Sequence, residues 1–191
     1  IGGFHLAADA TSQNAVATLR ERKRRQAKPF ALMARDMDVI RRYCDVNEQE
    51  AALLRSTTAP IVLLRRKAEA SPLPETIAPG QSLLVFMLPY SPLHHLLLES
   101  FETPLVMTSG NLSDEPQAIA NADARQRLGS IEDYLLLHDR EIVNRVDDSV
   151  VSVINGRERI LRWARGYAPA SLPLPAGFGK TPAILALGGE L

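Results

Sequence analysis

Short runs rich in Val, Ile and Leu alternate along this chain with segments of helical periodicity, and this alternation constrains the fold more than any other feature. The apolar runs have the length and branched side chains typical of buried strands, and we predict strands at residues 29–34, 60–66, 82–88, 104–109, 134–138 and 149–154. We predict helices at residues 10–22, 36–44, 47–56, 91–101 and 121–129. Such an order indicates an α/β fold with a largely buried sheet.

Two local motifs add detail to this prediction. Asn155-Gly156 separates two strand-like runs, which is the strongest short signal for a hairpin, so the sheet is predicted to be mixed. Asn47 and Glu50 have the spacing of a capping box and predict a helix start. Residues 169–180 are rich in Pro and Gly and read as a linker between domains.

Composition excludes several classes of function. The chain has 191 residues, enough for a real core, and its 22 basic residues balance 22 acidic ones. A general nucleic-acid binder is usually basic as a whole domain, so this balance argues against one. The single cysteine, Cys44, excludes an internal disulfide and fits a reducing cytoplasm, which is the location we expect. No apolar run reaches the roughly 18–20 residues that span a bilayer, and no signal-peptide pattern is present.

A zinc site is not expected. His94 and His95 are adjacent on a predicted helix and cannot share one face. No other His or Cys lies at metal-ligand spacing from them.

Residues 20–30, RERKRRQAKPF, form the densest charge in the chain, with six cations against one acid and thus a net charge of +5. Arg20, Arg22 and Arg24 fit a solvated helix end, where the helix dipole favours cations. A localisation signal or nucleic-acid patch has a similar composition, but the interleaved aromatic residues of a single-strand binder are absent.

The other cations of this segment suggest an anion site. Pro29 disfavours helix at Lys28, so we predict an extended segment in which Lys23 and Arg25 project to the same side. Three cations, including Lys28, would then converge. Arg offers a planar fork and Lys a point charge, a combination that suits a polyphosphate.

A polar turn follows the apolar run at residues 104–109. Thr108, Ser109 and Asn111 offer hydroxyl and amide groups where a strand ends, which could fix a phosphate or a small polar substrate. An ordinary turn whose side chains cap their own backbone has the same composition.

Further along, Asp147 and Asp148 could hold Mg²⁺ or pair with Arg145, and Arg162 and Arg165 could add cations or lie on the surface.

Taken together, the motifs resemble a known family. Lys23-x-Arg25 with Lys28-Pro29, and Ser109-x-Asn111 after a strand, are similar to the KxR…SxN signature of YrdC-type domains, the ATP-using domains of threonylcarbamoyl-adenylate synthases. Longer stretches resemble the YrdC-like domain of the HypF family of carbamoyltransferases, namely IGGFHLAADA, APIVLLRR, LPYSPLHHLLL, TSGNLSDEP, NRVDDSVV and RWARGYAP. One departure is Gln26, where the pattern usually has Pro.

The resemblance implies a twisted mixed β-sheet flanked by helices, with a concave pocket lined by cations. It implies that residues 1–168 are an adenylate-forming domain without the strand and helix that normally precede it. It also implies that residues 169–191 are a linker and the first residues of a following Kae-type transferase domain.

The function implied by the resemblance is carbamoyl-adenylate formation. Carbamate, released from carbamoyl phosphate elsewhere in HypF, would condense with ATP and release pyrophosphate. The carbamoyl group would then pass to the C-terminal cysteine of HypE, a step in cyanide-ligand synthesis for [NiFe]-hydrogenase. Mg²⁺ would arrive with ATP.

By the same resemblance, the residues of the signature would take part in phosphate binding, and neighbouring positions would line the pocket. The catalytic residues would be Lys23 and Arg25; the nucleotide or phosphate ligands would be Lys23, Arg25, Lys28, Ser109, Asn111, Arg145 and Arg165; the substrate pocket would include His5, His94 and Thr108.

Two alternatives remain open at this point. The chain could be a threonylcarbamoyl-adenylate synthase for tRNA modification, although the segments TSGN and LPYSPLHH are more similar to HypF. It could also be a non-catalytic module that binds nucleotides or double-stranded RNA on a cation-lined sheet.

Overall fold

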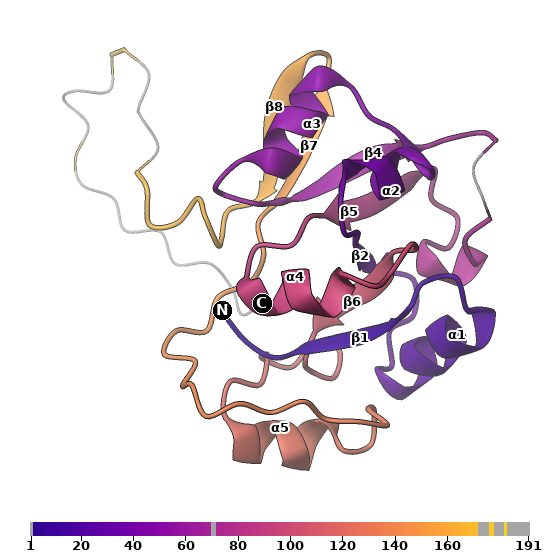
Figure 1. Ribbon diagram of the computed structural model, residues 1–191. Coiled ribbons are helices and arrows are strands. Elements are labelled where there is room, and N and C mark those ends of the chain that lie inside the picture. Colours follow the sequence, from indigo (N-terminus) through magenta and orange to yellow (C-terminus); the bar gives the residue numbers. More distant parts are fainter. Residues whose placement is uncertain (1, 70–71, 172–175, 178–181, 183–191) are drawn as a thin grey trace.

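The computed structural model describes residues 2–69, 72–171, 176–177 and 182 (Figure 1). Its elements, in chain order, are β1 (His5–Asp9), α1 (Gln13–Arg22), β2 (Ala31–Met33), α2 (Met37–Arg41), β3 (Cys44–Asp45), α3 (Glu48–Arg55), β4 (Ile61–Arg66), the 3-10 turn η1 (Glu75–Ile77), β5 (Leu83–Met87), α4 (Pro92–Leu98), β6 (Leu105–Ser109), α5 (Asn121–Leu128), β7 (Val150–Ile154) and β8 (Arg157–Arg162).

A single mixed sheet organises the described part of the chain. Its strands run in the order β1-β6-β2-β5-β4-β7-β8, and the short β3 pairs with β4 beside this path. The pairs β2–β5 and β4–β7 are parallel, whereas the other pairs are antiparallel. In Figure 1 the β7–β8 hairpin stands across the direction of β1, as expected for a strongly twisted sheet.

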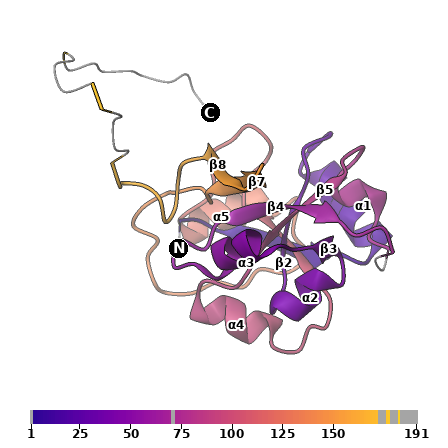
Figure 2. The ribbon, with the colours of Figure 1, turned by 90° about the horizontal axis from the view of Figure 1, so that it is seen from above.

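The two faces of the sheet are covered unequally. The larger apolar cluster contains residues from α1, α2, α3 and α5, so these helices pack on one face. The smaller cluster on the other face contains Leu98 of α4 with Met33, Met87 and Met107 of the strands. Seen from above, α4 lies at one margin of the molecule and α1 lies at another (Figure 2). One face therefore carries a thick core, and in the described part of the chain the smaller cluster on the other face is covered by α4.

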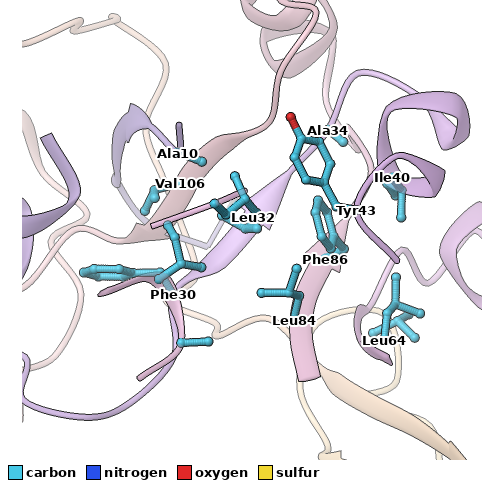
Figure 3. Packing of buried hydrophobic residues seen from close by; sticks show 14 of the residues in the cluster. Ala10, Phe30, Leu32, Ala34, Ile40, Tyr43, Leu64, Leu84, Phe86 and Val106 are labelled. Atoms are coloured by element: carbon cyan, nitrogen blue, oxygen red, sulfur yellow. The ribbon is translucent and has the colours of Figure 1, made fainter. Parts of the chain in front are cut away.

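The thick core is built on the central strands. Phe30, Leu32 and Phe86 are fully buried, and Tyr43 stacks on Phe86 with ring centroids 6.4 Å apart (Figure 3). Burying a large apolar side chain contributes about 1.5–3 kcal/mol, so this cluster supplies much of the stability that fixes the sheet.

Most of the predicted elements are confirmed within a few residues of their ends. Asn155 and Gly156 both have positive φ, 52° and 69°, as a two-residue hairpin turn requires. The capping box is also present: the Asn47 side chain accepts from the Glu50 N–H at 2.9 Å, and the Glu50 carboxylate accepts from the Asn47 N–H at the same distance.

The strand predicted at residues 134–138 is wrong. This segment belongs to no strand of the sheet, and Tyr134 and Leu136 are exposed over 95% and 69% of their surface. This apolar run has no neighbouring strand to pair with, so it runs along the surface between α5 and β7. It is held by a hydrogen bond of 2.7 Å from the Asn121 side chain to the His138 carbonyl and by stacking of the His138 ring on Phe4, with ring centroids 6.1 Å apart.

Two further observations concern the rest of the chain. None of the helices in the described ranges has the length and apolar character that crossing a membrane requires. The predicted linker at residues 169–180, and the predicted start of a following domain, fall largely on residues outside the described ranges.

Candidate functional site

The basic segment begins where α1 ends, and the helix closes in a Schellman motif. Lys23 is still helical, with φ −78° and ψ −7°, and Arg24 has φ 54°. The Arg24 N–H donates to the Glu21 carbonyl and the Arg25 N–H to the Arg20 carbonyl. The extended segment predicted here is therefore wrong, because a left-handed residue turns the chain between Lys23 and Arg25.

Lys23 is buried although it is a cation. Its side chain is 1% exposed, and its ammonium donates to the Ser109 carbonyl at 2.7 Å, to the Asn111 side-chain oxygen at 2.8 Å and to the Asn111 carbonyl. The Lys23 carbonyl accepts in turn from both the N–H and the hydroxyl of Ser113. The end of α1 and the loop after β6 are thus fastened together from both sides.

Asn111 connects the members of this loop. Its side-chain oxygen accepts from the Ser109 hydroxyl at 2.6 Å as well as from Lys23, and its amide nitrogen donates to the Glu115 carbonyl at 2.6 Å. Ser109 of the SxN spacing and Lys23 of the KxR spacing therefore donate to the same atom, the side-chain oxygen of Asn111. The structure brings Lys23, Ser109 and Asn111 into direct contact.

Arg20 and Arg25 shape the following loop through backbone carbonyls. Arg25 donates to the Lys28 carbonyl at 3.0 Å and to the Pro29 carbonyl at 2.6 Å, and its guanidinium lies 5.1 Å from the centre of the Phe30 ring. Arg20 donates to the carbonyls of Arg25, Thr76 and other residues of these two loops.

The interpretation of Arg20, Arg22 and Arg24 as a solvated helix end is correct only in part. Arg24 is exposed, whereas Arg20 is tied to the carbonyls named above. Arg22 pairs with Asp133 at 2.8 Å.

The cations of this segment lower one another's pKa values. Burial, together with the charges of Arg25 and Lys28, lowers the pKa of Lys23 to about 7. Burial likewise lowers the pKa of Arg25 to about 10, with added repulsion from Arg20 and Arg162. Within the described ranges, no carboxylate lies within 4 Å of the side-chain nitrogens of Lys23, Arg25 or Lys28. The local potential is therefore strongly positive.

Arg162 joins this group from the far end of the sheet. It is the last residue of β8, and its charge depresses the pKa of both Arg25 and Lys28, after the larger effect of burial on each. Its guanidinium lies 3.7 Å from the Asp147 carboxylate, and both side chains are partly exposed. Sequence reasoning left Arg162 undecided. We call Lys23, Arg25, Lys28 and Arg162 the cation cluster.

A second set of polar side chains lies next to the start of α4 and includes a pair of opposite charges. Its members, from four regions of the chain, are His5, Tyr90, His94, Asp148 and Arg165, and we call them the histidine cluster. The His94 ring meets the Tyr90 ring edge-on at 4.5 Å and lies 5.7 Å from the His5 ring. The Tyr90 hydroxyl lies 3.5 Å from Nε2 of His5.

Asp148 and Arg165 are the charged pair of the histidine cluster. Arg165 Nε donates to Asp148 at 2.9 Å, its terminal nitrogens donate to the carbonyls of Thr58 and Ala59, and its guanidinium lies 3.6 Å from the Tyr90 ring centre. Burial alone would raise the pKa of Asp148, but His5 and Arg165 outweigh it and hold the pKa at about 2. Asp148 therefore pairs with Arg165 and not with Arg145, the partner that the sequence suggested.

The remaining candidates lie around these clusters. Arg145 is exposed and donates from Nε to the Gln117 carbonyl at 2.8 Å, so it is not brought into either cluster by an ion pair in the described residues. Thr108 is 6% exposed, on the strand that ends at Ser109.

The two clusters meet at the edge of the sheet. In the antiparallel pairing of β1 with β6, His5 lies directly opposite Ser109, so their side chains share one face. On the other side, Asp147 contacts Arg162 while the next residue, Asp148, contacts His5 and Arg165. The start of β1 reaches the chain before β7 through a hydrogen bond from the Val146 N–H to the Gly2 carbonyl. A polyanion could therefore be held at the cation cluster with a small polar group beside it at the histidine cluster.

Comparisons with known proteins agree with this description. A family model for Sua5, YciO and YrdC proteins, described as telomere recombination, matches residues 1–164. A carbamoyltransferase HypF of Rhodobacter capsulatus is 54% identical over the whole chain, which covers 25% of that protein.

Solved structures give the same result. A full-length HypF in a phosphate- and nucleotide-bound form is 52% identical, with a TM-score of 0.85 over 88% of this chain and 26% of that one. A Sua5 of P. abyssi, at 22% identity, has a TM-score of 0.73 over 85% of this chain and 47% of that one, a likeness that concerns the fold alone.

The chain spans about a quarter of the length of its HypF relatives. The predicted α/β fold and the resemblance to YrdC-type domains are confirmed by these matches. The chain belongs to the Sua5/YciO/YrdC family, as a YrdC-like domain of the HypF kind.

Proposed function

We propose that this domain joins carbamate to ATP, forming carbamoyl-adenylate and releasing pyrophosphate. The observation that carries the proposal is the cation cluster, in which Lys23, Arg25 and Lys28 have no carboxylate partner within 4 Å among the described residues. Cations that lie close together and repel one another favour a bound polyanion, and a HypF that is 52% identical has been solved with phosphate and nucleotide.

The chemistry needs charge neutralisation more than a covalent nucleophile. A carbamate oxygen attacks the α-phosphorus of ATP, the bond from that phosphorus to the bridging oxygen breaks, and pyrophosphate leaves. Negative charge accumulates on the phosphate oxygens during this exchange. Arg25, Lys28 and Arg162 would bind those oxygens, and positioned cations of this kind contribute most when they are preorganised.

Lys23, Ser109 and Asn111 would act together in this proposal. The Lys23 ammonium holds the carbonyls and amide of the loop after β6, and its charge adds to the field at the phosphates. Ser109 and Asn111 would contact the triphosphate or the carbamate. Lys23 and Arg25 are thus the proposed catalytic residues, and His5, His94 and Thr108 would line the substrate pocket.

Arg145 would reach a phosphate only through its terminal nitrogens, because its Nε already donates to Gln117. Arg165 would act on a phosphate only through its charge at a distance, because its guanidinium already donates to Asp148 and to two backbone carbonyls. Both therefore remain weaker phosphate ligands in the proposal.

Mg²⁺ would be carried by ATP. In the described ranges no three His, Cys, Asp or Glu side chains gather as a metal cage, so the residues present do not form a magnesium site by themselves. Asp147 lies beside Arg162, where it could complement a metal bound to phosphate.

The reaction would belong to a larger assembly. We propose that residues 1–168 form the adenylate-forming domain and that carbamate comes from carbamoyl phosphate through other HypF domains. The carbamoyl group would then pass through a transferase domain to the C-terminal cysteine of HypE. The quarter-length match to HypF proteins supports this arrangement.

The test is pyrophosphate release from ATP with ammonium carbamate as the co-substrate. We expect release that depends on carbamate and stops when either reactant is left out. ATP binding without carbamate-dependent release, under conditions where the fold is intact, would contradict the proposal.

The alternative functions are distinguished in the same assay. AMP formation that requires threonine would favour a threonylcarbamoyl-adenylate synthase. Tight binding of double-stranded RNA with steep salt dependence, and no turnover of ATP, would favour a binding module.

A further inference from the structure

His94 is a buried polar side chain with an unused nitrogen. It lies on the inner side of α4 and is 8% exposed, whereas the next residue, His95, is exposed. Its Nδ1 atom touches no solvent and has no hydrogen-bond partner among the described residues. A buried polar atom without a partner costs free energy, so the position is expensive unless the atom serves a ligand.

The surroundings of His94 are polar but loosely connected. Nε2 of His5 lies 3.5 Å from the Tyr90 hydroxyl and 3.8 Å from the Asp148 carboxylate, both longer than an ordinary hydrogen bond. Tyr90 and His94 meet through ring edges rather than through polar atoms. A small polar group that approached the His94 ring would therefore displace no strong hydrogen bond of that ring.

The charges that face His94 decide which kind of group fits. Asp148 is held as a carboxylate by His5 and Arg165, so a hydrogen-bond donor is favoured on this side. Burial, together with the charge of His5, lowers the pKa of His94 to about 4, so its ring is neutral at neutral pH. A neutral imidazole offers one acceptor nitrogen, and Nδ1 has that role when Nε2 carries the proton.

The location of the histidine cluster relates it to the proposed chemistry. His5 faces Ser109 across the β1–β6 pair, and Ser109 shares the Asn111 side chain with Lys23. A group bound near His94 would therefore lie next to the phosphate-binding loop, on the face that α4 covers. In the proposed reaction, the carbamate has to lie beside the phosphates that it attacks.

We propose that Nδ1 of His94 accepts a hydrogen bond from the amino group of carbamate, which makes His94 a specificity-determining residue. The inference rests on the proposed function, because carbamate is the substrate there. It adds the means of selection: carbamate presents an N–H donor, whereas acetate, which has nearly the same shape, presents a methyl group that leaves Nδ1 without a partner. A site built around a buried acceptor discriminates strongly against an analogue without the donor.

The first measurement observes His94 directly. The chain has four histidines, so long-range ¹⁵N–¹H spectra of their side chains can be assigned with single His→Gln variants. We expect ammonium carbamate to shift the His94 ring nitrogens, and ammonium acetate at the same concentration and pH to leave them in place. Equal shifts with both salts, or none with either, would overturn the inference.

The second measurement separates specificity from structure. In His94→Ala the KM for carbamate in pyrophosphate release should rise about tenfold to a hundredfold, as expected for the loss of one hydrogen bond to substrate. The dissociation constant for ATP, measured by calorimetry, should change less than about twofold. His95→Ala is the matched control and should leave both quantities unchanged. An equal loss of ATP affinity in His94→Ala would assign His94 a merely structural role.

The two measurements also separate this inference from the proposed function. If carbamate shifts His94 while pyrophosphate is not released, the carbamate subsite stands and the reaction assigned to it is wrong. If pyrophosphate is released with carbamate while His94 does not respond, the reaction stands and the carbamate subsite is elsewhere.

Discussion

The cation cluster and the histidine cluster lie side by side, yet they stabilise their charges in opposite ways. In the histidine cluster, Asp148 and Arg165 neutralise each other at 2.9 Å in a largely buried pair. In the cation cluster, Lys23 and Arg25 are satisfied by carbonyl oxygens, which hold their hydrogens without cancelling their charge. Only the second arrangement leaves net charge to attract a polyanion, so hydrogen-bond satisfaction and charge compensation are separate properties of a site.

The largest expected effect tests the compensated pair. Arg165→Met should lower the free energy of unfolding by about 3–5 kcal/mol, because it leaves the Asp148 carboxylate buried without its main partner. Arg25→Met leaves no acid behind and should cost only about 1 kcal/mol, the size of ordinary hydrogen bonds. Urea denaturation of both variants measures this contrast. Similar losses in the two variants would break the comparison.

The second effect concerns catalysis. Arg25→Ala and Lys23→Ala should lower kcat/KM for carbamate-dependent pyrophosphate release by about 10²–10³-fold, the loss typical of a positioned electrostatic group. Arg24→Ala is the matched control, because Arg24 is an exposed cation of the same segment, and it should keep wild-type activity. Retention of full activity in Arg25→Ala would remove that residue from the proposed site.

A third prediction uses the lowered pKa of Lys23, about 7 in the folded chain against an ordinary 10.5. Between these values the unfolded chain binds more protons, so the free energy of unfolding should rise as pH increases from 7 to 9, by up to about 1.4 kcal/mol per pH unit. The rise should be smaller in Lys23→Met. Parallel stability profiles for the two proteins would contradict the burial of a charged Lys23.

His94 of the histidine cluster should affect stability in a lower pH range than Lys23 does. His94 has its pKa lowered to about 4 from an ordinary 6.5, so the folded chain binds fewer protons than the unfolded chain between these values. Stability should therefore decrease as pH falls from 6.5 towards 4, by up to about 1.4 kcal/mol per pH unit. His94→Phe should flatten this part of the profile. A profile unchanged by that substitution would mean that the His94 ring is accessible to protons in the folded state.

The smallest expected effect concerns the backbone strain at Arg24, after the end of α1. Arg24 has φ 54° at the position where a Schellman motif usually has glycine. Arg24→Gly should raise the free energy of unfolding by about 0.5–1 kcal/mol by relieving this strain, and Arg24→Ala should leave it nearly unchanged. A loss of stability in Arg24→Gly would show that the Arg24 side chain contributes more than its backbone costs.

Local signals explain which parts of the structure could be predicted from the sequence. Asn155-Gly156 and the pair Asn47 and Glu50 act through residues next to them, so their turn and helix start were identified correctly. The failed strand at residues 134–138 had the apolar run typical of a buried strand, but a strand also needs a neighbour, which only the tertiary fold supplies.

The candidate site shows the same limit. The convergence of Lys23 and Lys28 was expected from an extended segment, whereas the structure produces it by a left-handed turn at Arg24. The difference between His94 and His95 had a usable signal, since His94 and the buried Leu98 are four residues apart on one helix face. The approach of Arg162 had none, because it depends on the twist of the whole sheet.

The ties of Lys23 also have a consequence for the order in which the domain is made. Its ammonium binds oxygens of residues that follow 86 and 88 positions later, so these acceptors leave the ribosome seconds after the lysine at ordinary synthesis rates. During that interval the basic segment is a short helix end with a net charge of +5 and none of those acceptors. We therefore expect Lys23 to take its buried position only after β6 and the loop that follows it have left the ribosome.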